Sequence, residues 1–387
     1  MLNFDFRCNI EMDKFAMKLS IDRSDLLRSL NHMQSVVERR NTVPILSNVL
    51  MKAENGVLSL ASTDMDLEIN ESVAANVSAD GSTTAPAHTF HEIVRKFPDG
   101  SEVEIELNAE GSQITVCAGR SKFKLSCLPT EDFPEISAGD LPSEFSVPAA
   151  DLRALIDRTK FAMSTEETRY YLNGIYVHEA DNDGVKVLRA VSTDGHRLAR
   201  FEMPLPEGAS GMAGVIIPRK AVGEIRKLIE DAADLIKISL SDHKIRFEFD
   251  HIILTSKLID GTFPDYQRVI PQGNDKVVEL DPKIFSRAID RVSTISDGKS
   301  RALKITVNGK QMMLSASSPD AGSATEELEV NGSSEVEIGF NAKYLLDITS
   351  QIEGEGCRLI FADSNSPTII QDNSDPSALY VLMPLRV

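Results

Sequence analysis

Hydrophobic and polar residues alternate along this chain with two different periods, and the order of the two periods repeats. In each of three segments, alternating residues lead through a turn to apolar residues spaced three or four apart: Met17–Met33, Glu144–Met163 and Val277–Ile295. A period of two predicts a half-buried strand, and a period near 3.6 predicts an amphipathic helix. A second set of segments again predicts a strand followed by a helix: Thr83–Gly100, Gly214–Ala232 and Val336–Gly354.

The two kinds of segment take turns along the chain, which predicts three repeats of about 120–130 residues, a typical domain size. The turn-rich stretches Leu141–Phe145 and Val269–Asp275 separate them. We therefore expect domains at residues 17–142, 143–270 and 271–387. Residues 1–16 have no counterpart in the other repeats and are expected to form a disordered extension.

Strands come in runs between the helices rather than alternating with them one by one. The run that begins near Leu46 contains an Asn-Gly pair at Asn55–Gly56, which is typical of a tight hairpin. Runs of strands favour an α+β fold over a parallel βαβ fold. Each repeat is expected to pack two helices on antiparallel sheets.

Charge narrows the possible functions. The chain has 59 acidic and 41 basic residues and a formal net charge of −18, which argues against a surface that grips phosphate everywhere. Arg and Lys nevertheless recur opposite the apolar faces of five of the six predicted helices. Two interpretations stay open: ordinary solvated helix faces, or helices that line one surface facing a polyanion. The second would involve loose phosphate contacts rather than base-specific recognition.

Other classes of protein are disfavoured. No apolar run approaches the roughly 20 residues of a membrane-spanning helix, and the N-terminus lacks the pattern of a secretory signal. The four cysteines form no C-x-x-C pair, so they are expected to be small, reduced hydrophobic residues in a cytoplasmic protein, with no metal site.

Two segments carry candidate chemistry. Asp194 and His196, in the stretch Ser192–Ala199, could form an acid–base pair, but their spacing favours a turn between strands with no catalytic residue. The C-terminal stretch Ala378–Val387 is strongly apolar, which leaves two alternatives open: a core strand, or a Met-containing edge that lines a binding pocket.

Several motifs together resemble one known family. They are TVPILSN at Thr42–Asn48, GRSKFKLSCLP at Gly119–Pro129, RYYLNG at Arg169–Gly174, TDGHRLA at Thr193–Ala199, SKLIDGTFPDYQRV at Ser256–Val269 and YVLMPLRV at Tyr380–Val387. In order and spacing they resemble the bacterial DNA polymerase III beta subunit family, the sliding clamps. The resemblance runs from Met17 to Val387. It implies three clamp domains per chain and a head-to-tail homodimeric ring around duplex DNA. It also implies a processivity factor without catalysis or cofactor.

The resemblance also assigns residues. The family's partner-peptide pocket would comprise Leu172, Thr193, Gly195, His196, Arg197, Leu198, Pro264, Arg268, Val269, Val381, Met383, Pro384, Leu385 and Arg386. We call this set the predicted peptide site. DNA contacts would come from Arg40, Arg169, Tyr170, Tyr171, Arg219 and Lys220, and the dimer interface from Phe123, Leu125 and Ile295.

The expected partners are a second copy of the chain, encircled duplex DNA, the polymerase III alpha subunit, the clamp loader delta subunit, and other polymerases and repair proteins that carry a linear motif. Thr294 departs from the family pattern, which has an aliphatic residue there. Two other functions remain as alternatives: a hydrolase that uses Asp194 and His196, and a peptide-binding scaffold that does not encircle DNA.

Overall fold

The structure is a computed structural model that describes residues 15–137, 139–230, 235–296 and 301–386. The chain divides into two units. Unit 1 comprises Met1–Asp140 and Arg246–Ser256, and unit 2 comprises Leu141–Ile245 and Lys257–Val387. Of the proposed extension, residues 1–14 lie outside the described residues. Ala16 donates its backbone N–H to the carbonyl of Leu107 at 3.1 Å.

Unit 1 consists of antiparallel strands and two α-helices. The strands are β1 (Met17–Asp22), β2 (Asn48–Glu54), β3 (Val57–Thr63), β4 (Leu67–Ala74), β5 (Asn76–Ala79), β6 (Gly81–Pro86), β7 (Glu102–Leu107), β8 (Gln113–Ala118), β9 (Ser121–Ser126) and β17 (Ile252–Lys257). The helices are α1 (Arg23–Val36) and α2 (Ala87–Arg95), with short 3-10 turns η1 (Pro44–Ser47) and η2 (Thr130–Asp132).

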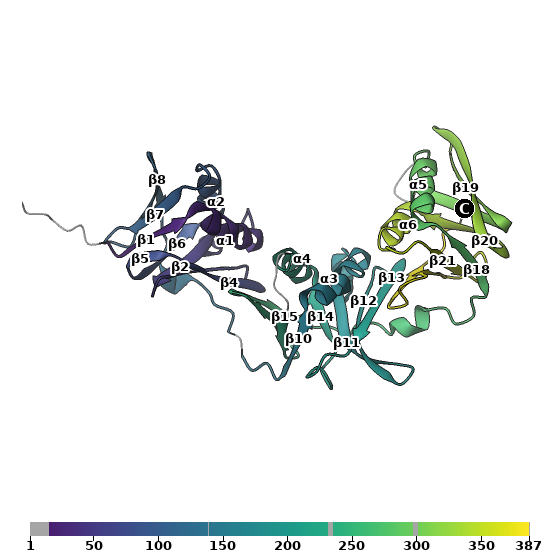
Figure 1. The fold of residues 1–387 in the computed structure, drawn as a ribbon, viewed down its shortest axis with the longest axis horizontal. Helices are drawn as coiled ribbons and strands as arrows, with labels where there is room; N and C mark the ends of the chain where they lie inside the picture. The colour runs from purple at the N-terminus through teal and green to yellow at the C-terminus, as the bar shows by residue number, and fades with distance from the viewer. Residues whose placement is uncertain (1–14, 138, 231–234, 297–300, 387) are drawn as a thin grey trace, which may run out of the picture. The chain divides into compact units, whose positions relative to one another are not determined.

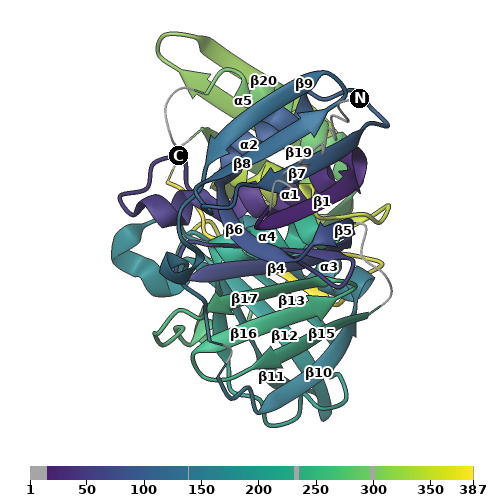
Figure 2. The ribbon, with the colours of Figure 1, turned by 90° about the vertical axis from the view of Figure 1, so that its left-hand side faces the viewer.

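These strands form two antiparallel arrangements. One is a five-stranded sheet in the order β5-β1-β7-β8-β9. In the other, β4 pairs with β17 (Figure 2) and with β3, and β2 pairs with β3 and β6. The helices α1 and α2 lie side by side (Figure 1).

Local sequence explains these elements. Buried residues alternate along β1, β7 and β8, as the period-two pattern predicts. Asp22 caps α1 by accepting a 2.7 Å hydrogen bond from the N–H of Ser24, and Leu26, Leu30 and Met33 form the helix's buried stripe. Asn55 and Gly56 join β2 to β3 with φ of 52° and 78°, so the predicted Asn-Gly hairpin is confirmed.

Unit 2 carries the remaining elements. Its strands are β10 (Ser143–Pro148), β11 (Gly174–Asn182), β12 (Val185–Thr193), β13 (Arg197–Pro204), β14 (Val215–Pro218), β15 (Leu235–Leu240), β18 (Lys276–Leu280), β19 (Ala302–Ser318), β20 (Gly322–Asn341), β21 (Cys357–Phe361), β22 (Thr368–Asp372) and β23 (Ala378–Leu382). Strand β16 (Lys244–Phe249) straddles the division between the units in sequence. The helices are α3 (Ala149–Asp157), α4 (Arg219–Leu228), α5 (Pro282–Ser293) and α6 (Ala342–Thr349). The 3-10 turns are η3 (Lys160–Ala162), η4 (Glu167–Leu172) and η5 (Tyr266–Val269).

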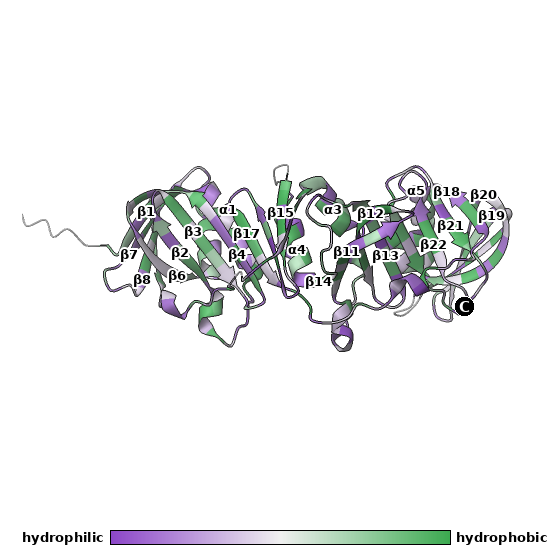
Figure 3. Ribbon diagram, turned by 90° about the horizontal axis from the view of Figure 1, so that it is seen from below, coloured by the Kyte–Doolittle hydropathy of each residue, from purple (hydrophilic) through white to green (hydrophobic). Residues whose placement is uncertain are grey.

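A ten-stranded sheet organises unit 2 in the order β14-β11-β12-β13-β23-β22-β21-β18-β20-β19. Its centre joins strands far apart in sequence, because β13 pairs antiparallel with the C-terminal strand β23. Hydrophobic stretches run through the strands of both units (Figure 3). Antiparallel sheets with six α-helices among the described residues agree with the predicted α+β class.

Candidate functional site

Asp194 holds the turn between β12 and β13. This is the residue that a hydrolase would need as its catalytic carboxylate. Asp194 Oδ1 accepts hydrogen bonds from the backbone N–H of His196 at 2.9 Å and of Arg197 at 3.1 Å. Gly195 takes a φ of +87°, which favours glycine. Asp194 therefore shapes the turn, and the His196 ring instead stacks on Tyr344 with a centroid separation of 6.2 Å.

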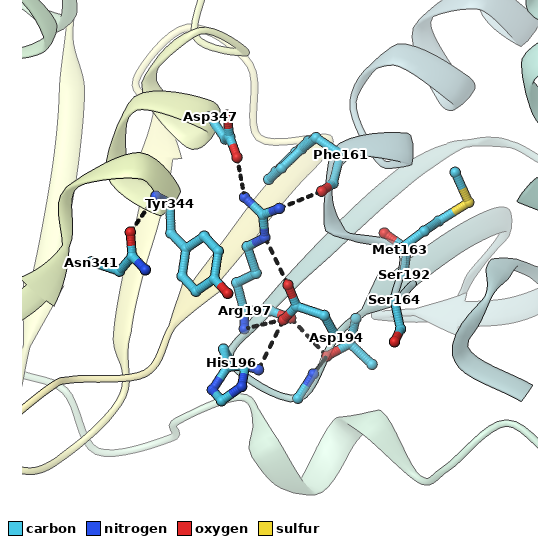
Figure 4. Close-up of polar contacts among 12 residues, drawn as sticks. Phe161, Met163, Ser164, Ser192, Asp194, His196, Arg197, Asn341, Tyr344 and Asp347 are labelled. Atoms are coloured by element: carbon cyan, nitrogen blue, oxygen red, sulfur yellow. Dashed lines mark hydrogen bonds and ion pairs between the residues drawn. The ribbon is translucent and has the colours of Figure 1, made fainter. Parts of the chain in front are cut away.

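Arg197 is the best-connected side chain near this turn, and it is only 8 % exposed. Its guanidinium donates to Asp347 Oδ2 at 2.5 Å, to the carbonyl of Phe161 at 2.6 Å and to Asp194 Oδ2 at 3.1 Å (Figure 4). It also lies over the Tyr344 ring, 4.3 Å from the centroid. A buried cation requires this compensation, so Arg197 joins β13 to helix α6.

Helix α6 is positioned for this contact by its own cap. Asn341 Oδ1 accepts from the N–H of Lys343 at 2.9 Å, and the helix then carries Tyr344 and Asp347 toward Arg197 (Figure 4). Burial raises the pKa of Tyr344, and the nearby Asp194 carboxylate adds to the effect. The Tyr344 phenol therefore stays neutral and offers an aromatic face.

The C-terminal strand lies directly beside the turn. Leu198 pairs with Val381 in the β13–β23 ladder, and the N–H of Met383 donates to the carbonyl of His196 at 2.9 Å. Strand β23 is thus a core strand, while the Met383 side chain just beyond it is 41 % exposed. The core-strand alternative therefore holds for β23, and the pocket alternative stays a prediction for the residues that follow it.

A hydrophobic cluster connects these strands to the segment that precedes β18. Leu172, Leu198 and Val381 pack in this cluster together with Phe263 and Tyr266. The neighbouring residues of that segment, namely Pro264, Arg268 and Val269, are exposed. Arg268 pairs with Asp265 at 2.8 Å.

All residues of the predicted peptide site therefore fall in unit 2, on the β12–β13 turn, strand β23 and its end, η4, and the segment around η5. Buried members form the base of this surface: Leu172, Arg197, Leu198 and Val381. The members that reach solvent are Gly195, His196, Pro264, Arg268, Val269, Met383 and Arg386, while Thr193, Pro384 and Leu385 are half-buried. This combination of an apolar base and cationic edges suits an extended peptide with aliphatic or aromatic anchors.

The predicted DNA contacts occupy several places. Arg40 is exposed beyond the end of α1 in unit 1. In unit 2, Arg169 bonds Glu166 through its Nε at 2.8 Å, and Tyr170 is 53 % exposed with its ring edge-on to Tyr171. Arg169, Tyr170 and Tyr171 share η4 with Leu172 of the predicted peptide site.

The basic residues that begin α4 do not all point freely into solvent. One Arg219 nitrogen donates to the carbonyls of Met163 and Ser164, at 2.8 and 2.6 Å, and burial lowers the pKa of Arg219. Lys220 follows it at the start of the helix. Arg219 consequently helps to fix α4, and only part of its guanidinium remains for another ligand.

The three predicted dimer residues lie in different units. Phe123 and Leu125 belong to β9, at the edge of the five-stranded sheet, and Phe123 is 40 % exposed beside Phe97. Ile295 follows α5 in unit 2 and is half-buried. An edge strand of this kind has unpaired backbone groups that a second chain can pair with.

The described residues hold no group of three or more His, Cys, Asp or Glu side chains that could bind a metal ion. Among the same residues, no helix is long and apolar enough to cross a membrane. Cys117, Cys127 and Cys357 are free thiols, and burial raises the pKa of Cys357 to about 12; Cys8 lies outside the described residues.

Sequence reasoning missed several residues that build this surface. Phe161, Tyr344 and Asp347 surround Arg197, and Phe263 and Tyr266 anchor the segment before β18. Asp347 lies 150 residues from Arg197, and no periodic pattern reports a pair at that separation. The one local sequence signal near these residues was the N-cap Asn341, which marks the start of α6.

Comparison with known proteins identifies the family. Models of the DNA polymerase III beta subunit match three times: the N-terminal domain at residues 17–137, the central domain at 146–265 and the C-terminal domain at 267–386. The Beta sliding clamp of Caulobacter vibrioides is 52 % identical over 372 residues, which cover 96 % of this chain and 100 % of the relative. The Beta sliding clamp of Escherichia coli K12 is 37 % identical over 373 residues, with the same coverage of both chains.

Solved structures agree with the sequence comparison. A sliding clamp of Caulobacter crescentus superposes with a TM-score of 0.92 at 52 % identity, covering 96 % of this chain and 100 % of the other. The clamp of Bartonella birtlesii bound to griselimycin gives 0.93 at 49 % identity with the same coverage. The expected clamp domains, with their helices and sheets, are confirmed. This chain belongs to the DNA polymerase III beta subunit family, the non-catalytic sliding clamps that act as processivity factors in DNA replication.

Proposed function

We propose that two copies of this chain close head-to-tail into a ring around duplex DNA and hold partner proteins by linear peptides at the predicted peptide site. One observation supports peptide binding. The β12–β13 turn, the end of β23 and the η5 segment meet over one apolar cluster. A tether of this kind raises the local concentration of a weakly bound polymerase at DNA.

The proposed ring has specific partner proteins, three domains in each chain and a defined interface between the two copies. The polymerase III alpha subunit, the clamp loader delta subunit, and other polymerases and repair proteins would compete for the same surface in the bacterial cytoplasm. The three domains would span residues 17–142, 143–270 and 271–387. In the ring, Phe123 and Leu125 on β9 of one copy would meet Ile295 of the other.

Peptide binding is tested by titrating a fluorescent peptide with the sequence Gln-Leu-Ser-Leu-Phe and measuring anisotropy. The test variant is Met383→Ala, because Met383 is exposed and its loss leaves the core intact. We expect the dissociation constant to rise roughly 5–30-fold, as for a central contact residue. Met313→Ala is the matched control, since Met313 is 39 % exposed on β19 of the same unit.

The outcomes separate the candidate functions. Equal affinity for the Met383 and Met313 variants, or no saturable binding by the unmodified chain, would contradict the peptide site. Binding lost in a chain that ends at Leu382 would agree with it, provided that the thermal transition is retained.

DNA binding separates a clamp from a scaffold that holds peptides without encircling DNA. Arg40→Ala combined with Tyr170→Ala removes two exposed side chains from the proposed DNA contacts. A clamp with this pair of changes keeps its peptide affinity but supports less DNA synthesis by a polymerase on primed template. Unchanged synthesis would favour the scaffold.

A further inference from the structure

The segment between β17 and β18 carries three residues of the predicted peptide site but has little regular structure. Its only helical turn is η5, and Pro264, Arg268 and Val269 are all exposed. The Arg268 side chain is 85 % exposed, and its ion pair is with Asp265 of the same segment. The position of these three side chains therefore depends on how the segment is fastened to the domain beneath it.

Two aromatic side chains fasten the segment. Phe263 is 8 % exposed, and its ring stacks on that of Tyr176 with centroids 5.0 Å apart and planes 8° apart. Tyr176 stacks in turn on His178 at 4.6 Å. Tyr266 is 5 % exposed and packs in the same hydrophobic cluster as Phe263 and Leu198. Pro264 lies between the two anchors, and Arg268 and Val269 follow the second.

The hydroxyl of Tyr266 sits between a fixed acceptor and a fixed donor. It is 3.0 Å from His178 Nε2 and 3.0 Å from Arg189 Nη1. His178 Nδ1 lies 2.7 Å from the carbonyl of Glu179, which only accepts, so Nδ1 carries the proton in the neutral ring. Nε2 is then an acceptor, and the Tyr266 hydroxyl must donate to it while accepting from Arg189.

Arg189 is itself held rigidly. Its Nε donates to Glu202 Oε1 at 2.7 Å, and both side chains of this pair are 6 % exposed. The other oxygen of Glu202 accepts from Asn182 Nδ2 at 2.9 Å. The hydroxyl of Tyr266 thus meets groups whose positions are set by strands β11, β12 and β13 rather than by the segment it belongs to. A satisfied buried network of this kind specifies one geometry.

We propose that Tyr266 is a positioning residue for peptide binding. Its hydroxyl is held between His178 and Arg189 and thereby fixes the positions of Pro264, Arg268 and Val269. Tyr266 is buried and would not touch the peptide. The inference rests on the proposed function, because it presumes that these three side chains line a peptide site.

The test compares two substitutions that each remove one buried phenolic oxygen. Tyr266→Phe removes a hydroxyl with two partners. Tyr380→Phe removes one on β23 that has no hydrogen-bond partner among the described residues, and Tyr380 is fully buried. We expect Tyr266→Phe to weaken binding of the fluorescent Gln-Leu-Ser-Leu-Phe peptide about five- to tenfold, because it leaves a buried donor and a half-buried acceptor unpaired. Tyr380→Phe is expected to bind within about twofold of the unmodified chain.

Two further readouts separate positioning from general stability. The ¹⁵N resonance of His178 Nε2 should shift in Tyr266→Phe, since its donor is lost, and stay in place in Tyr380→Phe. Amide exchange at Ile270, whose N–H donates to the carbonyl of Gln267 at 3.3 Å, should rise only in the first variant.

Each outcome decides the inference. Unchanged affinity of Tyr266→Phe, or an equal loss in Tyr380→Phe, would overturn it. A lower melting temperature of Tyr266→Phe with unchanged peptide affinity would also overturn it, by making the network merely structural. Failure of the unmodified chain to bind the peptide would instead refute the proposed function.

Discussion

At the scale of single residues, burial decides the role of Arg197 in the predicted peptide site. A guanidinium that is 8 % exposed is balanced by Asp194, Asp347 and the carbonyl of Phe161. Removing a buried cation leaves its carboxylate partners uncompensated, which costs more than the ion pair itself contributes. Arg197 therefore supports the surface from below, and His196 and Met383 beside it are the side chains that reach solvent.

Arg197→Ala is expected to lower the free energy of unfolding by about 3–5 kcal/mol, because two carboxylates lose their shared cation. Arg268→Ala is the control, since Arg268 is 85 % exposed and paired with a residue only three positions away. Its expected cost is about 0–1 kcal/mol. Urea denaturation measures both, and equal effects of the two substitutions would contradict this account of Arg197.

His178 gives a prediction for pH. Burial lowers the pKa of His178 below its usual value of 6.5, and the Arg189 guanidinium lowers it further, while Glu202 and the carbonyl of Glu179 oppose the shift. A depressed pKa means that the folded chain prefers the neutral ring, so the stability that His178 contributes is present above pH 6.5 and is lost as the pH falls. Protonation would also turn Nε2 into a donor, so the Tyr266 hydroxyl, which already accepts from Arg189, would lose its acceptor.

The chain should therefore melt at lower temperature as the pH is lowered from 7 toward 5, in part because of His178. His178→Gln should flatten that part of the profile, since an amide can accept from Tyr266 and does not titrate in this range. An NMR titration that placed the His178 pKa above 6.5 would refute the sign of the effect.

At the scale of elements, local sequence predicted those features whose cause is local. The Asn55–Gly56 hairpin and the Asp194–Gly195 turn follow from residues that tolerate positive φ or cap a turn. Helix α1 follows from its apolar spacing and the Asp22 cap. The partner of the terminal strand β23 could not be predicted in this way, because the β13–β23 ladder joins residues about 180 positions apart.

The same limit explains which parts of the site were found. Resemblance to a family pointed to residues on the turn, on η4, in the segment around η5 and at the C-terminus. The network of His178, Arg189, Glu202 and Tyr266 has no sequence signature, since the first three alternate with ordinary strand residues on β11, β12 and β13 and Tyr266 lies on η5. Burial of polar side chains is set by tertiary packing, which periodicity alone does not reveal.

The hairpin between β2 and β3 provides a test of this local logic. Gly56 has a φ of +78°, so Gly56→Ala is expected to destabilise the chain by about 1 kcal/mol. Gly223 lies inside α4, where an added Cβ meets nothing within 4 Å, so Gly223→Ala should stabilise it by about 0.5–1 kcal/mol. Thermal unfolding of the two variants should shift in opposite directions, and shifts of the same sign would contradict the argument.

At the scale of the whole molecule, net charge and DNA binding have to be reconciled. The chain carries a net charge of −18, and several helical arginines are engaged within the fold. Arg153 donates to the carbonyl of Ile229, Arg226 pairs with Asp157, and Arg291 pairs with Glu326. Lys96, Lys283 and Arg287 remain exposed on or beside helices. Modest phosphate contact by such residues would suit the proposed ring, which is retained by topology rather than by tight binding.

The most direct test of the account asks whether DNA ends release the protein. The chain is loaded onto a nicked circular plasmid by a bacterial clamp loader with ATP, isolated by gel filtration in high salt, and then exposed to a restriction enzyme that cuts the plasmid once. Salt weakens phosphate contacts but leaves a closed ring in place. We expect the protein to stay on the circle, to leave after the cut, and to be retained when bound proteins block both DNA ends. Equal retention on circular DNA and on linear DNA with free ends would contradict it.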